Sequence, residues 1–149
     1  MANKIVEVNT HMGNDWRVTA QVREHQLVID QPSASNTGAN PLETFVFSLA
    51  GCISTIAKMV AREQKIRLNT IDVSIKADIN TAGLQGLETD DPVGFKRIDM
   101  LVDMDATNGG SQLTDQQKIV FLDVVCHRCP IHDNLLKPSL VTHETMVNG

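Results

Sequence analysis

The chain has 149 residues, a formal net charge of −5 at pH 7 and a pI near 5.4. This length predicts one domain, residues 1–149, large enough to bury an apolar core without covalent cross-links. The acidic balance argues against a phosphate-binding surface, and the scarcity of aromatic side chains argues against stacking on bases. We therefore expect no nucleic-acid partner.

We find no stretch of about 18 apolar residues and expect no membrane span. Residues 1–5 lack the apolar core of a secretory signal, which favours a cytoplasmic protein. Structural disulfides are rare in a reducing cytosol. The three cysteines are therefore interpreted as residues for packing, metal binding or catalysis.

The first 30 residues alternate between apolar and polar side chains, most clearly at 18–22 and 27–29, which predicts strands. Turn-forming residues at 30–39 predict a loop. A long helix then begins at Asn40, which can act as N-cap ahead of Pro41. Glu43 falls at the capping-box position of this helix.

The apolar stripe of this helix includes Cys52 and continues to near residue 66. The rest of the chain predicts two more strands, a capped helix, a short helix and a final strand. Their ranges are 71–79 and 95–104 for the strands, 114–125 for the helix, 129–137 for the short helix, and 140–147 for the final strand. This order predicts an α+β fold with a largely antiparallel sheet and a long central helix carrying the first cysteine.

Two of the cysteines stand in informative places. Cys52 lies about three turns into its helix, where a buried core thiol is the simplest interpretation and the helix dipole no longer helps ionisation. Cys129 precedes Pro130 and can occupy an N-cap, where unpaired N–H groups favour a thiolate, and His127 and Arg128 add positive potential. A buried cap residue is the alternative for Cys129.

The spacing of Cys126 and Cys129 also permits a zinc site with His132, although this ligand set is incomplete without a further residue such as His143. A thioredoxin-like motif would need its first cysteine at the start of a helix, whereas Cys126 ends one. We therefore favour a packing role for Cys126 and predict no bound metal or cofactor.

Two motifs resemble one protein family. Residues 38–43 (Gly-Ala-Asn-Pro-Leu-Glu), followed by 49–52 (Leu-Ala-Gly-Cys), are similar to the loop and cysteine helix of the OsmC/Ohr superfamily (osmotically inducible protein and organic hydroperoxide resistance protein). Residues 129–135 (Cys-Pro-Ile-His-Asp-Asn-Leu) resemble the start of its second cysteine helix. The resemblance covers nearly the whole chain.

This resemblance implies an OsmC-like fold and an intertwined homodimer with two active sites at the subunit interface. It also implies thiol-dependent reduction of organic hydroperoxides in oxidative-stress defence. Cys52 would be the peroxidatic thiol and Cys129 the resolving thiol, linked as a disulfide during turnover. An external dithiol would reduce that disulfide, and family analogy offers a lipoylated protein in this role.

Family peroxidases also pair an Arg from the N-terminal strands with a Glu at the start of the cysteine helix. Glu43 matches this Glu, although it lies roughly 180° around the helix from Cys52 and would have to act through the Arg. Plain capping is the other interpretation of Glu43. Arg17 is the candidate that would stabilise the Cys52 thiolate, and Arg23 is the second candidate.

A different class of function also fits these residues. The same fold could form a dimer that binds a small molecule or lipid in an apolar pocket, or that senses redox state, without turning over a peroxide. Oxidation of Cys52 by one equivalent of hydroperoxide separates the enzyme from the binding protein.

Overall fold

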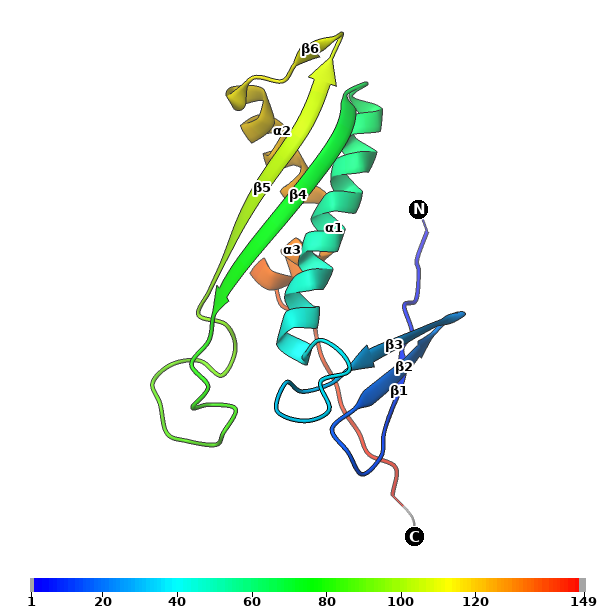
Figure 1. The fold of residues 1–149 in the computed structure, drawn as a ribbon, viewed down its shortest axis with the longest axis vertical. Helices are drawn as coiled ribbons and strands as arrows, with labels where there is room; N and C mark the ends of the chain where they lie inside the picture. The colour runs from blue at the N-terminus through cyan, green and yellow to red at the C-terminus, as the bar shows by residue number, and fades with distance from the viewer. Residues whose placement is uncertain (1, 148–149) are drawn as a thin grey trace. The chain divides into compact units, whose positions relative to one another are not determined.

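The computed structural model describes residues 2–147. The chain forms two compact units, residues 1–47 and 48–149, and each is described by itself. Figure 1 shows the order of the elements, with three strands before the first helix and a long two-stranded hairpin after it. The predicted α+β class is confirmed, with two antiparallel sheets in place of one.

The first unit holds a three-stranded antiparallel meander. Its strands are β1 (Asn9–Met12), β2 (Val18–Val22) and β3 (His25–Ile29), and β2 lies between the other two. The turn between β2 and β3 places Arg23 at a φ of 52°, the left-handed region that non-glycine residues rarely adopt. The prediction of strands in this region is therefore confirmed.

A buried carboxylate organises the loop that follows β3. Asp30 is 1% exposed and accepts hydrogen bonds from the backbone N–H of Gln31 at 2.8 Å and from the hydroxyl of Thr37 at 2.7 Å. These bonds hold the pKa of Asp30 below its usual value. Gly38 closes the loop, since a Cβ there would lie 2.8 Å from the carbonyl oxygen of Val28.

Helix α1 (Pro41–Glu63) starts with the predicted capping box. The Asn40 side chain accepts from the Glu43 N–H at 2.8 Å, and the Glu43 carboxylate accepts from the Asn40 N–H at 2.9 Å. The helix ends three residues before the predicted position. Lys65 adopts a φ of 58° and the N–H of Ile66 returns to the Ala61 carbonyl at 2.8 Å, which turns the chain into the next strand.

The length and apolar composition of α1 would be sufficient to cross a membrane, contrary to the expectation that no such stretch exists. The core helix of a globular protein meets the same test. In the second unit, α1 acts as such a core helix, because one of its stripes is buried. The members of that stripe are Leu49, Ile53, Ala57, Val60 and Ala61.

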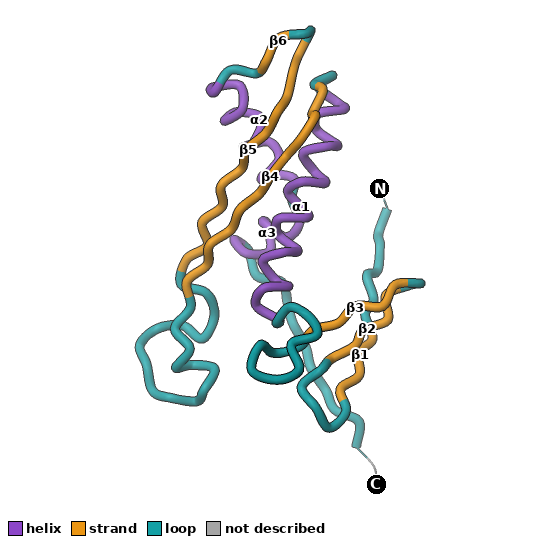
Figure 2. Tube along the Cα trace, viewed as in Figure 1, coloured by secondary structure: helices purple, strands orange, loops and turns teal. Residues whose placement is uncertain are grey.

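The sheet of the second unit is a long hairpin with a short third strand. Its strands are β4 (Arg67–Asp78), β5 (Arg97–Asn108) and β6 (Ser111–Gln112), in that spatial order. Alternate residues of β4 and β5 face the helices, so the period-2 pattern that predicted these strands also decides which face is buried. Figure 2 shows the two long strands running side by side along this unit.

Two further helices complete the second unit, α2 (Asp115–Arg128) and α3 (Pro130–Leu136). The predicted capping box at the start of α2 is present, with Thr114 and Gln117 exchanging hydrogen bonds of 3.1 and 2.8 Å. Phe121 and Val125 form the buried stripe of α2 and pack in the same core as the α1 stripe.

The predicted final strand at 140–147 is wrong. Residues 138–147 form no helix or strand, and Leu140 and Val141 are exposed. An alternating apolar pattern specifies a strand only where a neighbouring strand pairs with its backbone, and none of the described strands pairs with this segment.

Candidate active site

Cys52 and Cys129 lie in contact in the second unit. The two Sγ atoms are 2.9 Å apart although the residues are 77 positions apart in the chain. Both thiols are free, so this is a reduced pair, with the Cys129 S–H donating to the Cys52 sulfur. The separation is short enough for a disulfide to form with a small movement of the two side chains.

The position of Cys52 follows from its helix. Cys52 directly precedes Ile53, which belongs to the buried stripe of α1. The Cys52 side chain is partly exposed and packs against the core without being enclosed by it. An apolar organic molecule that reached this sulfur would therefore meet hydrocarbon side chains around it.

The position of Cys129 follows from the stripe of α2. Phe121, Val125 and Cys129 repeat every four residues, so the thiol continues the buried face one residue beyond the helix. Cys129 is 0% exposed. It is both the C-cap of α2 and the N-cap of α3, and its Sγ accepts from the N–H of His132 at 3.4 Å. The predicted N-cap role is confirmed.

The expectation that the N-cap favours a thiolate at Cys129 is wrong. Burial, helped by the hydrogen bond that Cys129 donates to Cys52, raises the pKa of Cys129 to about 11. The N–H of His132 acts in the opposite direction but is outweighed. Cys129 therefore stays a protonated thiol at neutral pH, while Cys52 is the sulfur that receives its hydrogen bond.

The positive charge of Arg128 is paired with a carboxylate of α1. Its guanidinium forms a two-pronged ion pair with Glu63, with Nη1–Oε2 at 2.5 Å and Nη2–Oε1 at 3.0 Å. This contact lowers the pKa of the Glu63 carboxyl. This pair could not be predicted from the sequence, because its members are 65 residues apart and neither belongs to a recognisable motif.

The three charged residues that the sequence proposed for the site all lie in the first unit. Glu43 caps α1, as described above. Arg17 is near enough to Asp30 for its charge to contribute, as the smallest of several causes, to the lowered pKa of that carboxyl. Arg23 lies in the β2–β3 turn, with its Nη1 3.5 Å from the Glu24 carboxylate. The structure thus brings together the two predicted thiols. The contacts of the three charged residues are described within the first unit alone.

Cys126 is a third thiol, partly buried at the end of α2. Burial raises its pKa, and the nearby negative charge of Asp123 adds to the rise. Across residues 2–147, no three or more His, Cys, Asp or Glu side chains are gathered where they could hold a metal ion. The zinc interpretation of Cys126, Cys129 and His132 therefore has no ligand cluster to support it.

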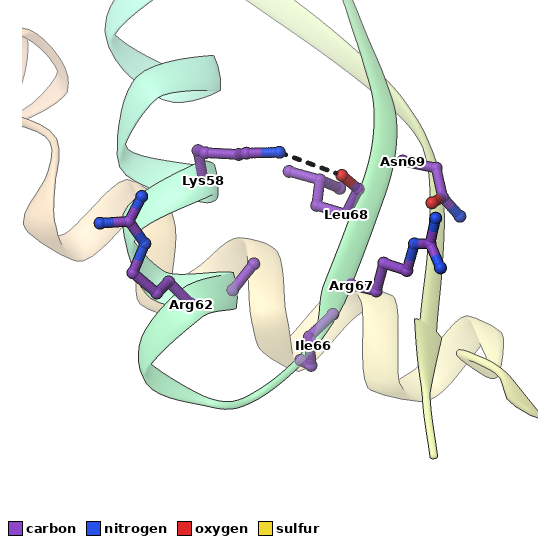
Figure 3. Close-up of a pocket in the computed structure, with 7 residues that line it drawn as sticks. Lys58, Arg62, Ile66, Arg67, Leu68 and Asn69 are labelled. Carbon is purple, nitrogen blue, oxygen red and sulfur yellow. Dashed lines mark hydrogen bonds between the residues drawn. The ribbon is translucent and has the colours of Figure 1, made fainter. Parts of the chain in front are cut away.

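A pocket of about 430 Å³ lies between the end of α1 and the start of β4 (Figure 3). Lys58, Arg62 and Arg67 line it, and the Lys58 ammonium donates to the Leu68 carbonyl at 3.4 Å. Cations are expected here, since they stabilise the negative end of the α1 dipole. Neither thiol lines this pocket.

The chain matches the family model described as OsmC-like protein over residues 34–144. It is 26% identical over 135 residues to a protein of Mycoplasma genitalium named hydroperoxide reductase, covering 89% of this chain and 88% of that protein. A Mycoplasma pneumoniae protein of the same name is 23% identical over 134 residues, with the same coverage.

Solved structures show the same fold. The crystal structure of an OsmC-like protein from Mycoplasma pneumoniae matches with a TM-score of 0.78 at 22% identity, covering 92% of this chain and 91% of that one. An OsmC-like protein of Vibrio cholerae matches with a TM-score of 0.74 at 11% identity, covering 89% and 94%. Since the family model covers residues 34–144, more than half of the chain, this protein belongs to the OsmC-like family.

Proposed function

We propose that this protein is a thiol peroxidase that reduces organic hydroperoxides, with Cys52 and Cys129 as its redox pair. The observation that carries the proposal is the 2.9 Å contact between the two sulfur atoms. The names of the two Mycoplasma relatives, both hydroperoxide reductases, support the same reaction.

The surroundings of the two thiols support different roles for them. A peroxidatic sulfur must meet the peroxide, and Cys52 is the more exposed of the pair. A resolving thiol needs no access to substrate, and Cys129 is buried, protonated and already directed at the Cys52 sulfur. We therefore assign attack on the peroxide to Cys52 and disulfide formation to Cys129.

The reaction then has three balanced steps. Cys52 attacks the O–O bond of the hydroperoxide as a thiolate, forming an S–O bond and releasing the alcohol once the leaving oxygen takes up a proton. The Cys129 thiol displaces the hydroxyl of the Cys52 sulfenic acid, forming the S–S bond and releasing water. An external dithiol, such as the dihydrolipoyl group of another protein, reduces this disulfide by exchange. The two cysteines return to thiols and the external dithiol becomes a disulfide.

The proposal includes a homodimer in the cytoplasm. Strand β4 is a 12-residue edge strand, and among the described strands only β5 pairs with it. An open edge of this length invites a further strand, and a second copy of the chain would supply one in an intertwined dimer. Within such a dimer we assign Arg17 to stabilise the Cys52 thiolate, with Glu43 orienting it.

The test is turnover of cumene hydroperoxide by catalytic amounts of protein, with dihydrolipoamide as the reductant. We expect the wild type and Cys126→Ser to consume the peroxide, Cys52→Ser to be inactive, and Cys129→Ser to stop after one turnover or less. Binding of the peroxide without consumption would contradict the proposal and favour the non-catalytic binding protein.

A further inference from the structure

The ion pair between Glu63 and Arg128 joins two elements of the proposed redox site. Glu63 is the last residue of α1, the helix that carries Cys52, and Arg128 is the last residue of α2, directly before Cys129. Both oxygens of the carboxylate are engaged, at 2.5 and 3.0 Å. Such two-pronged Arg–carboxylate pairs fix orientation as well as distance.

The energetics argue against a role in global stability alone. The side chains of Arg128 and Glu63 are 38% and 55% exposed, and exposed ion pairs add little to the free energy of unfolding. Their contribution is local. The thiol of Cys129 belongs to the short junction between α2 and α3, and the ion pair limits how far that junction can move relative to α1.

The junction is thereby attached to α1 at two points. One is the contact of Cys129 with Cys52, and the other is the contact of Arg128 with Glu63. Eleven residues separate Cys52 from Glu63, which places them on nearly the same side of α1, about 16 Å apart along its axis. When Cys52 reacts, its contact with Cys129 changes, and the ion pair remains to restrict movement of the junction relative to α1.

We propose that Glu63 and Arg128 are positioning residues that hold the Cys129 thiol against Cys52 and so accelerate closure of the disulfide. The inference rests on the proposed peroxidase function. The accelerated step is the attack of the Cys129 sulfur on the Cys52 sulfenic acid, in which the S–S bond forms, the S–O bond breaks and water leaves. The preceding attack on the peroxide is independent of the pair, because neither residue touches Cys52.

The experiment measures the two steps separately in the full-length protein. After one equivalent of cumene hydroperoxide, samples are quenched over time, and mass spectrometry follows the Cys52 sulfenic acid, trapped with dimedone, and the Cys52–Cys129 disulfide. Glu63→Gln and Arg128→Gln should leave sulfenic acid formation unchanged within about twofold and slow closure by about fivefold, the scale of one exposed ion pair.

Three controls distinguish positioning from a general effect. Arg62 is a cation in the same turn of α1 as Glu63, and it makes no ion pair among the described residues. In Arg62→Gln the disulfide should therefore close at the wild-type rate. The charge reversal Glu63→Arg with Arg128→Glu should recover most of the lost rate. Raising the salt concentration should slow closure in the wild type and leave both Gln variants unaffected.

The outcomes separate the two proposals. Absence of both the Cys52 sulfenic acid and the Cys52–Cys129 disulfide in the wild type contradicts the peroxidase function itself. Normal sulfenic acid formation with wild-type closure in Glu63→Gln and Arg128→Gln overturns the positioning role alone, as does equal slowing in Arg62→Gln. If a Gln variant fails to fold, Arg128→Lys serves instead, since it keeps the charge, loses the two-pronged geometry and should close at an intermediate rate.

Discussion

Cys129 donates its S–H to the Cys52 sulfur, 2.9 Å away, from a site with no exposure to solvent. The contact gives two chemically equal side chains unequal environments. One thiol is held protonated, with a pKa near 11, and the other is partly exposed and receives the hydrogen bond. This asymmetry gives the two sulfur atoms different chemistry, and it depends on the packing around them.

The first prediction concerns the fate of the oxidised sulfur. In Cys129→Ser, peroxide should convert Cys52 to a sulfenic acid that persists and then oxidises further, because the thiol in contact with it has been removed. Dimedone should label Cys52 in this variant, and the extent of labelling should be at least tenfold lower in the wild type. Equal labelling in the two proteins would show that Cys129 does not resolve the sulfenic acid.

The second prediction concerns stability at alkaline pH. The pKa of Cys129 is raised in the folded protein, so the stabilisation is complete below the unfolded pKa, near 8.5, and is lost as the pH rises through about 11. Between pH 8 and 11 the free energy of unfolding should fall by on the order of 2 kcal/mol more than in Cys129→Ala. Urea titrations of the two proteins, compared at each pH, measure this difference. Parallel pH curves would contradict it.

The third prediction concerns the cap of α2. Thr114→Ala removes the oxygen that accepts from the Gln117 N–H and should cost about 1 kcal/mol in the free energy of unfolding. Thr114→Ser retains the hydroxyl and should stay within about 0.5 kcal/mol of the wild type. Chemical denaturation distinguishes the two variants, and an equal loss in both would indicate that the methyl group, rather than the cap, stabilises this turn.

The fourth prediction concerns the core that brings the thiols together. Ile53 is fully buried beside Cys52, and Ile53→Ala should destabilise the fold by about 2–5 kcal/mol through lost burial and the cavity left behind. Leu101 is 73% exposed on β5, and Leu101→Ala should change stability little in the isolated chain. If Leu101→Ala instead lowers the free energy of unfolding, and the loss grows with protein concentration, that side chain lies in an interface between copies.

Local chemistry made much of the fold predictable. The capping boxes at Asn40 and Thr114 depend only on residues three apart, and both are present. The alternation of apolar and polar residues predicted the two long strands, and Cys52 packs against the core as the helical spacing of its neighbours predicted. The short β6 was missed because two residues carry no readable period.

Tertiary relationships were harder to predict. The N-cap position of Cys129 was correct, but its effect on ionisation was reversed by burial and by Cys52, which only the folded chain reveals. Arg128 was expected to favour a thiolate and instead pairs with Glu63. The tail at 140–147 was expected to be a strand, and its pattern alone could not supply a partner strand.

The most direct test of the redox pair is peptide mass spectrometry of the reduced protein after one equivalent of cumene hydroperoxide. The account predicts loss of two hydrogens, mapped to a single link between Cys52 and Cys129, with Cys126 remaining a free thiol. Unmodified thiols, or a link confined to Cys126 and Cys129, would contradict it.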